Sequence, residues 1–425
     1  MPSDPRAPAW RELFQAFGRI GVMSFGGPAA QISVMHGELV DRRRWLSEDS
    51  FLGALSFCML LPGPEAMQLA TYSGWRLRGV AGGLMAGLLF VLPGAAVVAA
   101  LALAYVQWGT LPGVQAAFMG IKALVVALVL QALWRLSQRA LPGWAQRAWA
   151  VAGFVAIFAL GVPFPLLILV AALWGLWRGG AARAQATPVP PTSGTAPSWR
   201  RSLVTATLWA VAWLAPVLLL RLSGATFLAD LGAFFARLAV LSFGGAYALL
   251  AWMAQVTVDQ HGWLTPGQMI DALGLAETTP GPLILVTQFV AMVAGAVRAG
   301  PELGLAAGAL TLWVTFVPCF LFIFVLAPHV ERLLALPRLK AALAAVTAAV
   351  VGVIASLALW FTLHVLFDTI RGAGAPPLPV WESFQPLAAA LVALALALVF
   401  ILRTGLLTNL VAMAALGLAA VQLGL

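Results

Sequence analysis

Two kinds of short motif interrupt apolar stretches of this sequence, and both would leave backbone amides unpaired in apolar surroundings. They are Phe25-Gly26-Gly27-Pro28 with Phe243-Gly244-Gly245, and Pro62-Gly63-Pro64 with Pro280-Gly281-Pro282. A helix that starts after such a break presents free N–H groups and the positive end of its dipole to the gap. Anions bind helix ends of this kind. The alternative for a single Gly-Gly is close helix packing.

Basic side chains inside apolar segments are costly and usually mark a pathway for a substrate or ion. Arg19 and Arg237 each precede a Ser-Phe-Gly-Gly motif by five residues. We interpret them as two cations for one dianion, with extension toward the membrane interface as the alternative. Lys122 is interpreted as a substrate attractor or as the ion-pair partner of a glutamate.

Glu65 and Glu277 flank the two Pro-Gly-Pro breaks but in different positions. Glu65 would lie in the first turn of an outgoing half-helix, where the positive dipole end favours a carboxylate, so a structural role is expected. Glu277 would lie in the last turn of an incoming half-helix, where the dipole and burial favour a bound proton. If transport is proton-coupled, we expect Glu277 to carry the proton.

The predicted anion site combines the breaks with these side chains. Its residues are Arg19, Ser24, Gly26, Gly27, Gly63, Lys122, Arg237, Ser242, Gly244, Gly245, Thr278, Thr279 and Gly281, supported by Gln68 and Gln288. The four histidines have no metal-ligand spacing, and no nucleophile has a base at a suitable distance in the sequence. We therefore expect neither a metal, nor a cofactor, nor enzymatic activity.

The composition requires a lipid-facing surface. Of 425 residues, 62% are hydrophobic and 9% are charged, whereas soluble domains carry about 25% charged residues. The net charge of +9 would suggest nucleic-acid binding, but the basic residues lie in short loops, which is typical of the cytoplasmic side of membrane proteins. Cys58 and Cys319 lie in apolar runs, so no disulfide scaffold is expected. We also expect no removable signal peptide.

Uncharged stretches predict ordinary helices and broken ones. Ordinary helices are expected near 79–107, 113–137, 203–221, 303–328, 340–366, 384–402 and 405–424, with two short spans within 148–177. Broken segments are expected at 11–36, 50–75, 228–255 and 268–297. The polar segment 178–201, rich in Pro, Ala, Gly and Thr, is the predicted linker.

The chain contains an internal duplication. A shift of 218 positions aligns residues 24–64 with 242–282 at 15 identities in 41 positions. A shift of 225 then pairs Gly79 with Gly304 and Gly83 with Gly308. Predicted domains are 1–178 and 223–425 as repeats, 179–201 as a cytoplasmic linker and 202–222 as a connecting transmembrane helix.

Each copy would cross the membrane an even number of times, so the connecting helix inserts the second copy upside down. The predicted fold is an all-α polytopic membrane protein with two inverted-topology repeats and broken or re-entrant helices. The positive-inside rule favours re-entrant hairpins, and thirteen spans with kinked helices remain the alternative. Loop 37–49 should then be cytoplasmic and loop 256–267 external.

Long motifs in both halves resemble the chromate ion transporter family in its two-domain form. They are SFGGPAAQISVMHGELVDRRRWLS, FCMLLPGPEAMQLATYSGW and GGLMAGLLFVLPG, followed by FGGAYALLAWMAQ, GLAETTPGPLILVTQFV and WVTFVPCFLFIFVLAPHVERL. The resemblance implies a bacterial inner-membrane protein that exports chromate and confers chromate resistance, with sulfate as the close analogue. The second copy has Ala246 where the first has Pro28, so the two Gly-Gly breaks need not be equal.

Other readings of the sequence stay open. They are a transporter of sulfate or another oxyanion, an anion channel, and a membrane-embedded enzyme. The paired breaks favour a closed central site over a continuous pore. The coupled ion and the presence of a homodimer cannot be read from the sequence.

Overall fold

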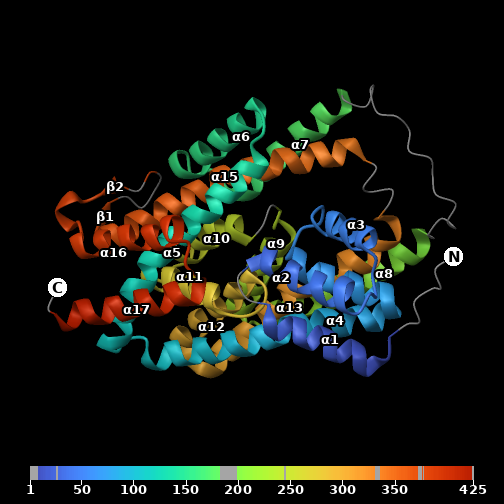
Figure 1. Cartoon of the computed structure of the whole chain (residues 1–425), viewed down its shortest axis with the longest axis horizontal. Coiled ribbons are helices and arrows are strands. Elements are labelled where there is room, and N and C mark those ends of the chain that lie inside the picture. The colour runs from blue at the N-terminus through green and yellow to red at the C-terminus, as the bar shows by residue number, and fades with distance from the viewer. Residues whose placement is uncertain are drawn as a thin grey trace. The chain divides into compact units, whose positions relative to one another are not determined.

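The computed structural model describes residues 8–24, 27–181, 199–243, 246–330, 336–371, 376 and 378–423, without the side chains of 181, 246–248, 277 and 278. The described chain is helical throughout (Figure 1), apart from one antiparallel pairing of two short strands. Strand β1 (Ile370–Arg371) pairs with β2 (Leu378–Pro379). The predicted all-α class holds except for this pairing.

Five described helices are long and apolar enough to cross a membrane. They are α4 (Glu65–Trp108), α5 (Pro112–Ala140), α8 (Trp199–Leu222), α13 (Pro301–Leu326), which η6 (Ala327–His329) extends, and α15 (Pro337–Leu366). Shorter apolar helices are α7 (Phe164–Ala181), α12 (Val286–Ala299), α16 (Pro386–Leu396), which η8 (Ala397–Ile401) extends, and α17 (Leu406–Gln422). The protein is therefore a multi-pass membrane protein.

The described residues pack into two compact units, and each unit takes segments from both halves of the sequence. Unit 1 comprises residues 1–100, 180–245 and 279–340, and unit 2 comprises 101–179, 246–278 and 341–425. The boundaries predicted above concern the sequence repeats and do not coincide with these units.

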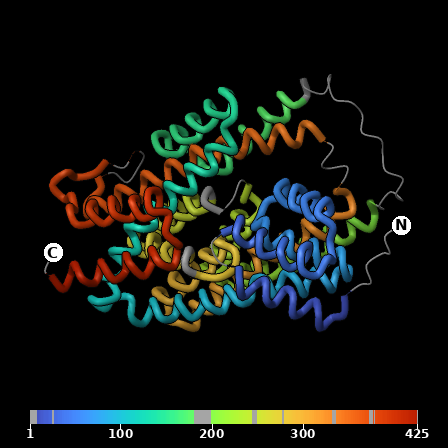
Figure 2. Tube along the Cα trace, viewed as in Figure 1, coloured from blue at the N-terminus to red at the C-terminus, as the bar shows by residue number. Residues whose placement is uncertain are grey.

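Unit 1 is built around α13. It contains α1 (Trp10–Met23), α2 (Gly27–His36), η1 (Gly37–Arg42), α3 (Glu48–Cys58), the first part of α4, α8, α9 (Thr226–Val240), η5 (Leu283–Leu285), α12 and α13. Helix α13 packs against α12, α8 and α9. Across the α8–α13 contact, Trp213 donates to the carbonyl of Val314 at 2.8 Å and Trp313 donates to that of Ala212 at 2.9 Å. The short blue helices of this unit can be followed in Figure 2.

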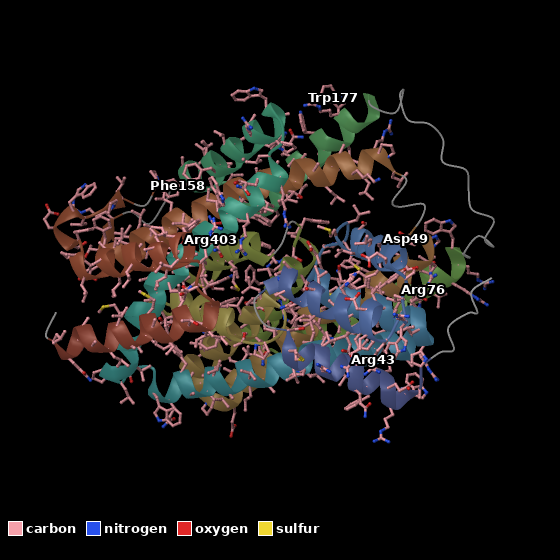
Figure 3. All side chains as sticks on the ribbon, in the orientation of Figure 1. Arg43, Asp49, Arg76, Phe158, Trp177 and Arg403 are labelled. Carbon is pink, nitrogen blue, oxygen red and sulfur yellow. The ribbon has the colours of Figure 1, made fainter. Side chains whose placement is uncertain are left out.

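Unit 2 is organised by α5, which packs against α17, α16 and α11 (Pro266–Thr278). It also contains α6 (Trp144–Phe154), η2 (Val155–Ala159), α7, α10 (Ala246–Ala254), η4 (Gln255–Gln260), α15 and η7 (Trp381–Ser383). Side chains on Gly120 and Gly417 would overlap the carbonyls of Met413 and Ala116, so small residues set the α5–α17 distance. Trp177, 77% exposed, projects from the end of α7 (Figure 3), as an interfacial tryptophan does.

Glycine kinks divide the long apolar stretches of unit 1 at equivalent places. Gly79 has φ +64° and splits α4 into two helices, while Gly300 has φ +89° and separates α12 from α13. Both are in the left-handed region that favours glycine. At the kink the structure therefore pairs Gly79 with Gly300, a shift of 221, in place of Gly79 with Gly304, while the starts of α5 and α15 at Pro112 and Pro337 keep the shift of 225.

Candidate functional site

Each break predicted in a described segment interrupts a helix. Helix α1 ends at Met23 and α2 begins at Gly27, while the two Pro-Gly-Pro motifs precede α4 and the turn η5 before α12. Gly27, Gly63 and Gly281 have φ of +82°, +121° and +91°. Only glycine adopts these values without strain, so the sequence breaks are backbone requirements.

The breaks of the two halves are joined by a reciprocal pair of backbone hydrogen bonds within unit 1. Gly63 N–H donates to the carbonyl of Ser242 at 3.0 Å, and Gly281 N–H donates to the carbonyl of Ser24 at 2.7 Å. Under the 218-residue shift, Gly63 corresponds to Gly281 and Ser24 to Ser242. Each Pro-Gly-Pro is thus bonded to the Ser-Phe-Gly-Gly motif of the other half. We call this arrangement the crossed junction.

Two of the amides expected to face an anion are therefore already occupied by protein carbonyls, those of Gly63 and Gly281. Donors left at the breaks are the first N–H groups of the helices that follow, which lack intrahelical partners. At the start of α2, Ala29 and Ala30 are exposed. An anion site at this break would use that helix end.

Glutamine side chains hold carbonyls of the junction in place. Gln68 Nε2 donates to the carbonyl of Pro62 at 2.6 Å, and Gln31 Nε2 donates to that of Gly281 at 2.6 Å. Gln288 Nε2 instead reaches the carbonyl of Ala95 at 3.1 Å. Among the described residues, the buried Oε1 atoms of Gln68 and Gln288 accept no hydrogen bond, so both can accept one from a ligand or water.

The remaining predicted residues of the breaks are only partly described. Ser24 and Ser242 are buried, and their hydroxyls donate to the carbonyls of Ile20 at 2.5 Å and Ala239 at 2.9 Å within their own helices. Thr279 is buried. Gly26, Gly244 and Gly245, and the side chains of Thr278 and Glu277, lie outside the described residues.

The two arginines predicted to share a dianion are both exposed. Arg19 Nε lies 3.3 Å from Met23 Sδ, and Arg237 Nε donates to the carbonyl of Ala233 at 3.1 Å. Each is therefore held by its own helix. This arrangement favours the alternative in which the guanidinium groups extend toward the interface, and the shared anion site remains a prediction without support from the described contacts.

Glu65 occupies the position expected for it, at the first residue of α4. Its side chain is half-buried, and the described residues give it no hydrogen bond or ion pair. The helix terminus is thus the nearest compensation for its charge.

Lys122 has an acidic partner, but the partner is an aspartate. Its Nζ lies 3.3 Å from Asp271 Oδ1, and Tyr105 donates its hydroxyl to Asp271 Oδ2 at 2.8 Å. The three residues come from α5, α11 and α4 within unit 2. Sequence reasoning missed Asp271 and Tyr105. The available signal was a lone aspartate in the apolar stretch that leads to the second Pro-Gly-Pro.

The turn between α2 and α3 carries a separate ionic cluster, near the labelled Arg43 (Figure 3). Arg43 and Arg42 pair with Glu38 at 2.8 and 3.2 Å. Burial raises the pKa of Glu38, but the hydrogen bond from Arg43 and the charges of both arginines outweigh it, so the pKa lies below its usual value.

His36 joins this turn to the start of α3. Its Nε2 lies 2.7 Å from Glu48, and its Nδ1 lies 3.3 Å from Asp41. The hydrogen bond with Glu48 is the main cause that raises the pKa of His36; partial burial lowers it, and the charges of Glu48 and Asp41 raise it further. The imidazolium form therefore stabilises this turn.

The turn between α10 and α11 repeats the backbone pattern of this turn. Trp45 and Leu46 donate their N–H groups to the carbonyl of Leu39, and Trp263 and Leu264 donate theirs to that of Thr257. A π-helical turn precedes each, at Gly37–Arg42 and Gln255–Gln260. All of these positions match under the 218-residue shift, so the duplicated sequence has duplicated local structure.

The chain has the features of a membrane transport protein. It combines several membrane-spanning helices with broken helices whose breaks are joined in a reciprocal pair. The sequence model described as "Chromate transporter" matches residues 11–176 and 229–421, and the chain belongs to the chromate transporter family. The two matched segments agree with the internal duplication.

Three named relatives are similar over most of their length. The chromate transport protein of Pseudomonas aeruginosa is 34% identical over 359 residues, covering 82% of this chain and 80% of the relative. That of Cupriavidus metallidurans is 28% identical, covering 81% and 80%. A probable chromate transport protein of Synechococcus elongatus is 29% identical, covering 81% and 82%. No solved structure matches the chain.

Proposed function

We propose that the protein exports chromate across the bacterial inner membrane as a secondary transporter. Family membership and relatives named as chromate transport proteins support the substrate class. The crossed junction is the observation that carries the mechanism, because irregular backbone at membrane depth is tolerated where it is buried in protein or lines a cavity. In transporters of other families, broken helices of repeated halves form the substrate site.

The two halves are proposed to be inverted repeats. Support comes from the matched turns after α2 and α10, from the reciprocity of the crossed junction, and from the single helix α8 between the halves. The loop 256–267 carries no Lys or Arg, whereas the loop 37–49 contains Arg42, Arg43 and Arg44. This difference fits a cytoplasmic first turn and an external second turn.

The chromate site is proposed to lie at the crossed junction, with the oxyanion held by the first N–H groups of the helices that begin there. The backbone supplies oriented donors without a buried charge that must be neutralised when the site is empty. Ser24, Ser242 and Thr279 are buried beside these helix ends. A tetrahedral dianion can bridge two such ends with different oxygens.

The membrane potential is sufficient to drive export. Each negative charge that leaves a cell with an interior about 100 mV negative gains about 2.3 kcal/mol, so a dianion gains about 4.6 kcal/mol. That corresponds to about three decades of concentration. Proton coupling is an additional proposal, with Glu277 as the sequence-predicted carrier and Glu65 as the alternative.

Uptake of labelled chromate into inverted vesicles tests this proposal, with the potential and the pH gradient set independently. We expect chromate uptake driven by potential, counterflow against unlabelled chromate, and competition by excess sulfate. Uptake of sulfate with no uptake of chromate would reassign the substrate. Flux without counterflow would indicate a channel.

The junction itself is tested with alanine variants of its two glycines and with alanine variants of two control glycines that also have positive φ. A methyl group on Gly63 would lie 2.7 Å from Gln68 Nε2, and one on Gly281 would lie 3.0 Å from Leu285 Cδ1. Gly79 and Gly300 also have positive φ but open space around a methyl group. Equal loss of flux in all four alanine variants would show that backbone strain in general, and not the junction contacts, causes the loss.

A further inference from the structure

The buried carboxylate of Asp271 depends on two groups from other helices. Lys122 Nζ lies 3.3 Å from Oδ1, and the Tyr105 hydroxyl donates to Oδ2 at 2.8 Å. An ionised carboxylate in apolar surroundings is tolerated only with such partners. Oδ2 therefore accepts a hydrogen bond, whereas Oδ1 has only the ion-pair contact among the described residues. The loss of Lys122 would leave a carboxylate here without a cation.

The two members of the ion pair differ in accessibility. The side chain of Asp271 is 3% exposed, and that of Lys122 is 23% exposed. Lys122 Nζ also lies 3.8 Å from the place where a methyl group on Gly267 would be. With no side chain at Gly267, this residue does not cover the ammonium group, and part of the lysine side chain stays accessible.

The groups that face Asp271 come from a short set of elements. Helix α5 contributes Lys122 and α4 contributes Tyr105, while α17, which also packs against α11, has no charged residue. On α11 itself the other acidic residue is Glu277, whose side chain lies outside the described residues. Lys122 is thus the one described cation paired with Asp271.

The repeated fold does not require this pair, which joins the two halves, because the positions related to it by the duplication lack it. Asp271 corresponds to Gly53 under the 218-residue shift, and Lys122 corresponds to Thr347 under the shift of 225 that relates the starts of α5 and α15. A buried ion pair contributes little to stability compared with apolar residues of similar volume. Its absence from the repeat-related positions, Gly53 and Thr347, is better explained by a role of the pair in transport.

We propose that Lys122 and Asp271 form a proton-gated oxyanion site: protonation of Asp271 releases the Lys122 ammonium group to bind one oxygen of the transported dianion. This inference rests on the proposed function and adds to it a second binding site, separate from the crossed junction, at which transport is coupled to a proton. Tyr105 is a positioning residue, since its hydroxyl holds Asp271 Oδ2 and not the substrate.

The charges of the step balance. Before binding, the dianion, Lys122 ammonium, Asp271 carboxylate and one proton sum to −1. After binding, the dianion, the ammonium group and the neutral carboxylic acid also sum to −1. Without protonation, the dianion would lie beside a second negative charge in a low dielectric, which is strongly unfavourable. One proton and one dianion therefore occupy the site together.

The direction of coupling follows from this occupancy. A proton and a dianion that bind together move together, so the proton accompanies chromate outward and one net negative charge crosses per cycle. The potential then drives export with about 2.3 kcal/mol per 100 mV, half the value for a bare dianion. An exchanger would instead require the proton and the anion to bind alternately.

The test uses the full-length protein in proteoliposomes, with chromate flux, charge movement and luminal pH recorded together. We expect wild type to move one proton with each chromate in the same direction. Asp271→Asn should keep chromate flux and move about two charges per chromate without proton movement. Lys122→Gln should raise the half-saturating chromate concentration at least about tenfold, because the binding cation is removed.

Three further variants make the outcome specific. Lys122→Arg keeps the cation and should keep proton movement, and Tyr105→Phe should shift the pH at which flux is half-maximal without changing the charge per chromate. Asp230→Asn breaks the exposed Arg221–Asp230 pair and should leave both readouts unchanged. Comparison of variants at one pH cancels the protonation of chromate itself.

Should Asp271→Asn not fold, Lys122→Arg and Tyr105→Phe decide the question by the same readouts. Proton movement that persists in folded Asp271→Asn, or that is lost in Glu277→Gln alone, would overturn the inference and leave chromate export intact. Chromate flux in wild type without proton movement, or with protons moving in the opposite direction to chromate, would also overturn the inference and leave chromate export intact. No chromate flux in wild type would overturn the proposed function first.

Discussion

The two halves of this protein share a backbone plan and differ in where they place charge. The turn after α2 carries the ionic cluster of buried Glu38 with Arg42 and Arg43, whereas the matched turn after α10 carries none of these. The second half instead has the buried Asp271 on α11, which pairs with Lys122 of the first half. Backbone hydrogen bonds in the two turns are nevertheless the same. Duplication has kept the parts that shape the breaks and changed the parts that carry charge.

The largest expected effect concerns the side of the membrane on which each of the two turns lies. Ser47 and Thr265 match under the shift, are exposed, and cap α3 and α11 in the same way. Cysteines at these two positions should label from opposite sides of the membrane, with an all-or-none contrast for an impermeant reagent. Labelling of both from one side would contradict inverted repeats.

The next largest effect is expected at the crossed junction. Gly63→Ala and Gly281→Ala should each lower chromate flux by at least about tenfold, because a left-handed residue with a side chain costs about 1–2 kcal/mol and the methyl group also disturbs its neighbours. Gly79→Ala and Gly300→Ala add backbone strain alone, so chromate flux should decrease less in these two variants. A large loss in one half only would show that the junction is not reciprocal.

A moderate, pH-dependent effect is expected in the charged turn. The pKa of His36 is raised in the folded protein, so its contribution is fully present below the unfolded pKa and is lost as pH rises through the folded value. Amide exchange in residues 37–47 should therefore become faster as pH rises through neutrality, beyond the intrinsic increase. His36→Gln should remove this excess, and residues 255–265 provide the matched internal control.

Glu38 should act in the opposite direction. Its pKa is lowered, so its contribution is present above the unfolded pKa and is lost as pH falls through the folded value. Glu38→Gln should make the same turn less protected at neutral pH and insensitive to mild acid. After correction for the intrinsic pH dependence of exchange, protection of the wild-type turn that stays constant down to acidic pH would contradict this.

The smallest effect is expected for the two related arginines. Arg19→Gln and Arg237→Gln should change chromate flux by less than about threefold, since both guanidinium groups are exposed and lie against their own helices. Lys at either position should behave as wild type. A loss as large as that of the junction glycines would restore the shared-dianion prediction.

Helices, breaks and repeat could be predicted from the sequence because each depends on local signals. The kinks at Gly79 and Gly300 show the limit. Glycines recur every four residues at 79, 83 and 87 and at 300, 304 and 308, so a shift of 221 aligns three pairs and a shift of 225 still aligns two. Four residues are about one helical turn, which leaves the apolar face unchanged. The left-handed φ of Gly79 and Gly300 in the structure places both residues at a kink and selects the shift of 221 there.

Partners across long sequence distances could not be predicted. Lys122 and Asp271 lie 149 positions apart, and the search for a partner near the breaks favoured glutamates beside Pro-Gly-Pro. The occupied amides of Gly63 and Gly281 were missed for the same reason. A break exposes a donor in the sequence, but the carbonyl that satisfies it belongs to the other half.

The crossed junction also determines what kind of mutagenesis can detect it. Both of its hydrogen bonds join backbone groups, so alanine at Ser24 or Ser242 removes a hydroxyl that bonds elsewhere and leaves the junction bonds intact. The two copies can therefore drift in side chain while the join between them persists. Alanine at the two serines would therefore not report on the junction, and alanine at Gly63 or Gly281 adds backbone strain and a methyl group. An amide-to-ester replacement that deletes the N–H of residue 63 or 281 would test the hydrogen bonds alone.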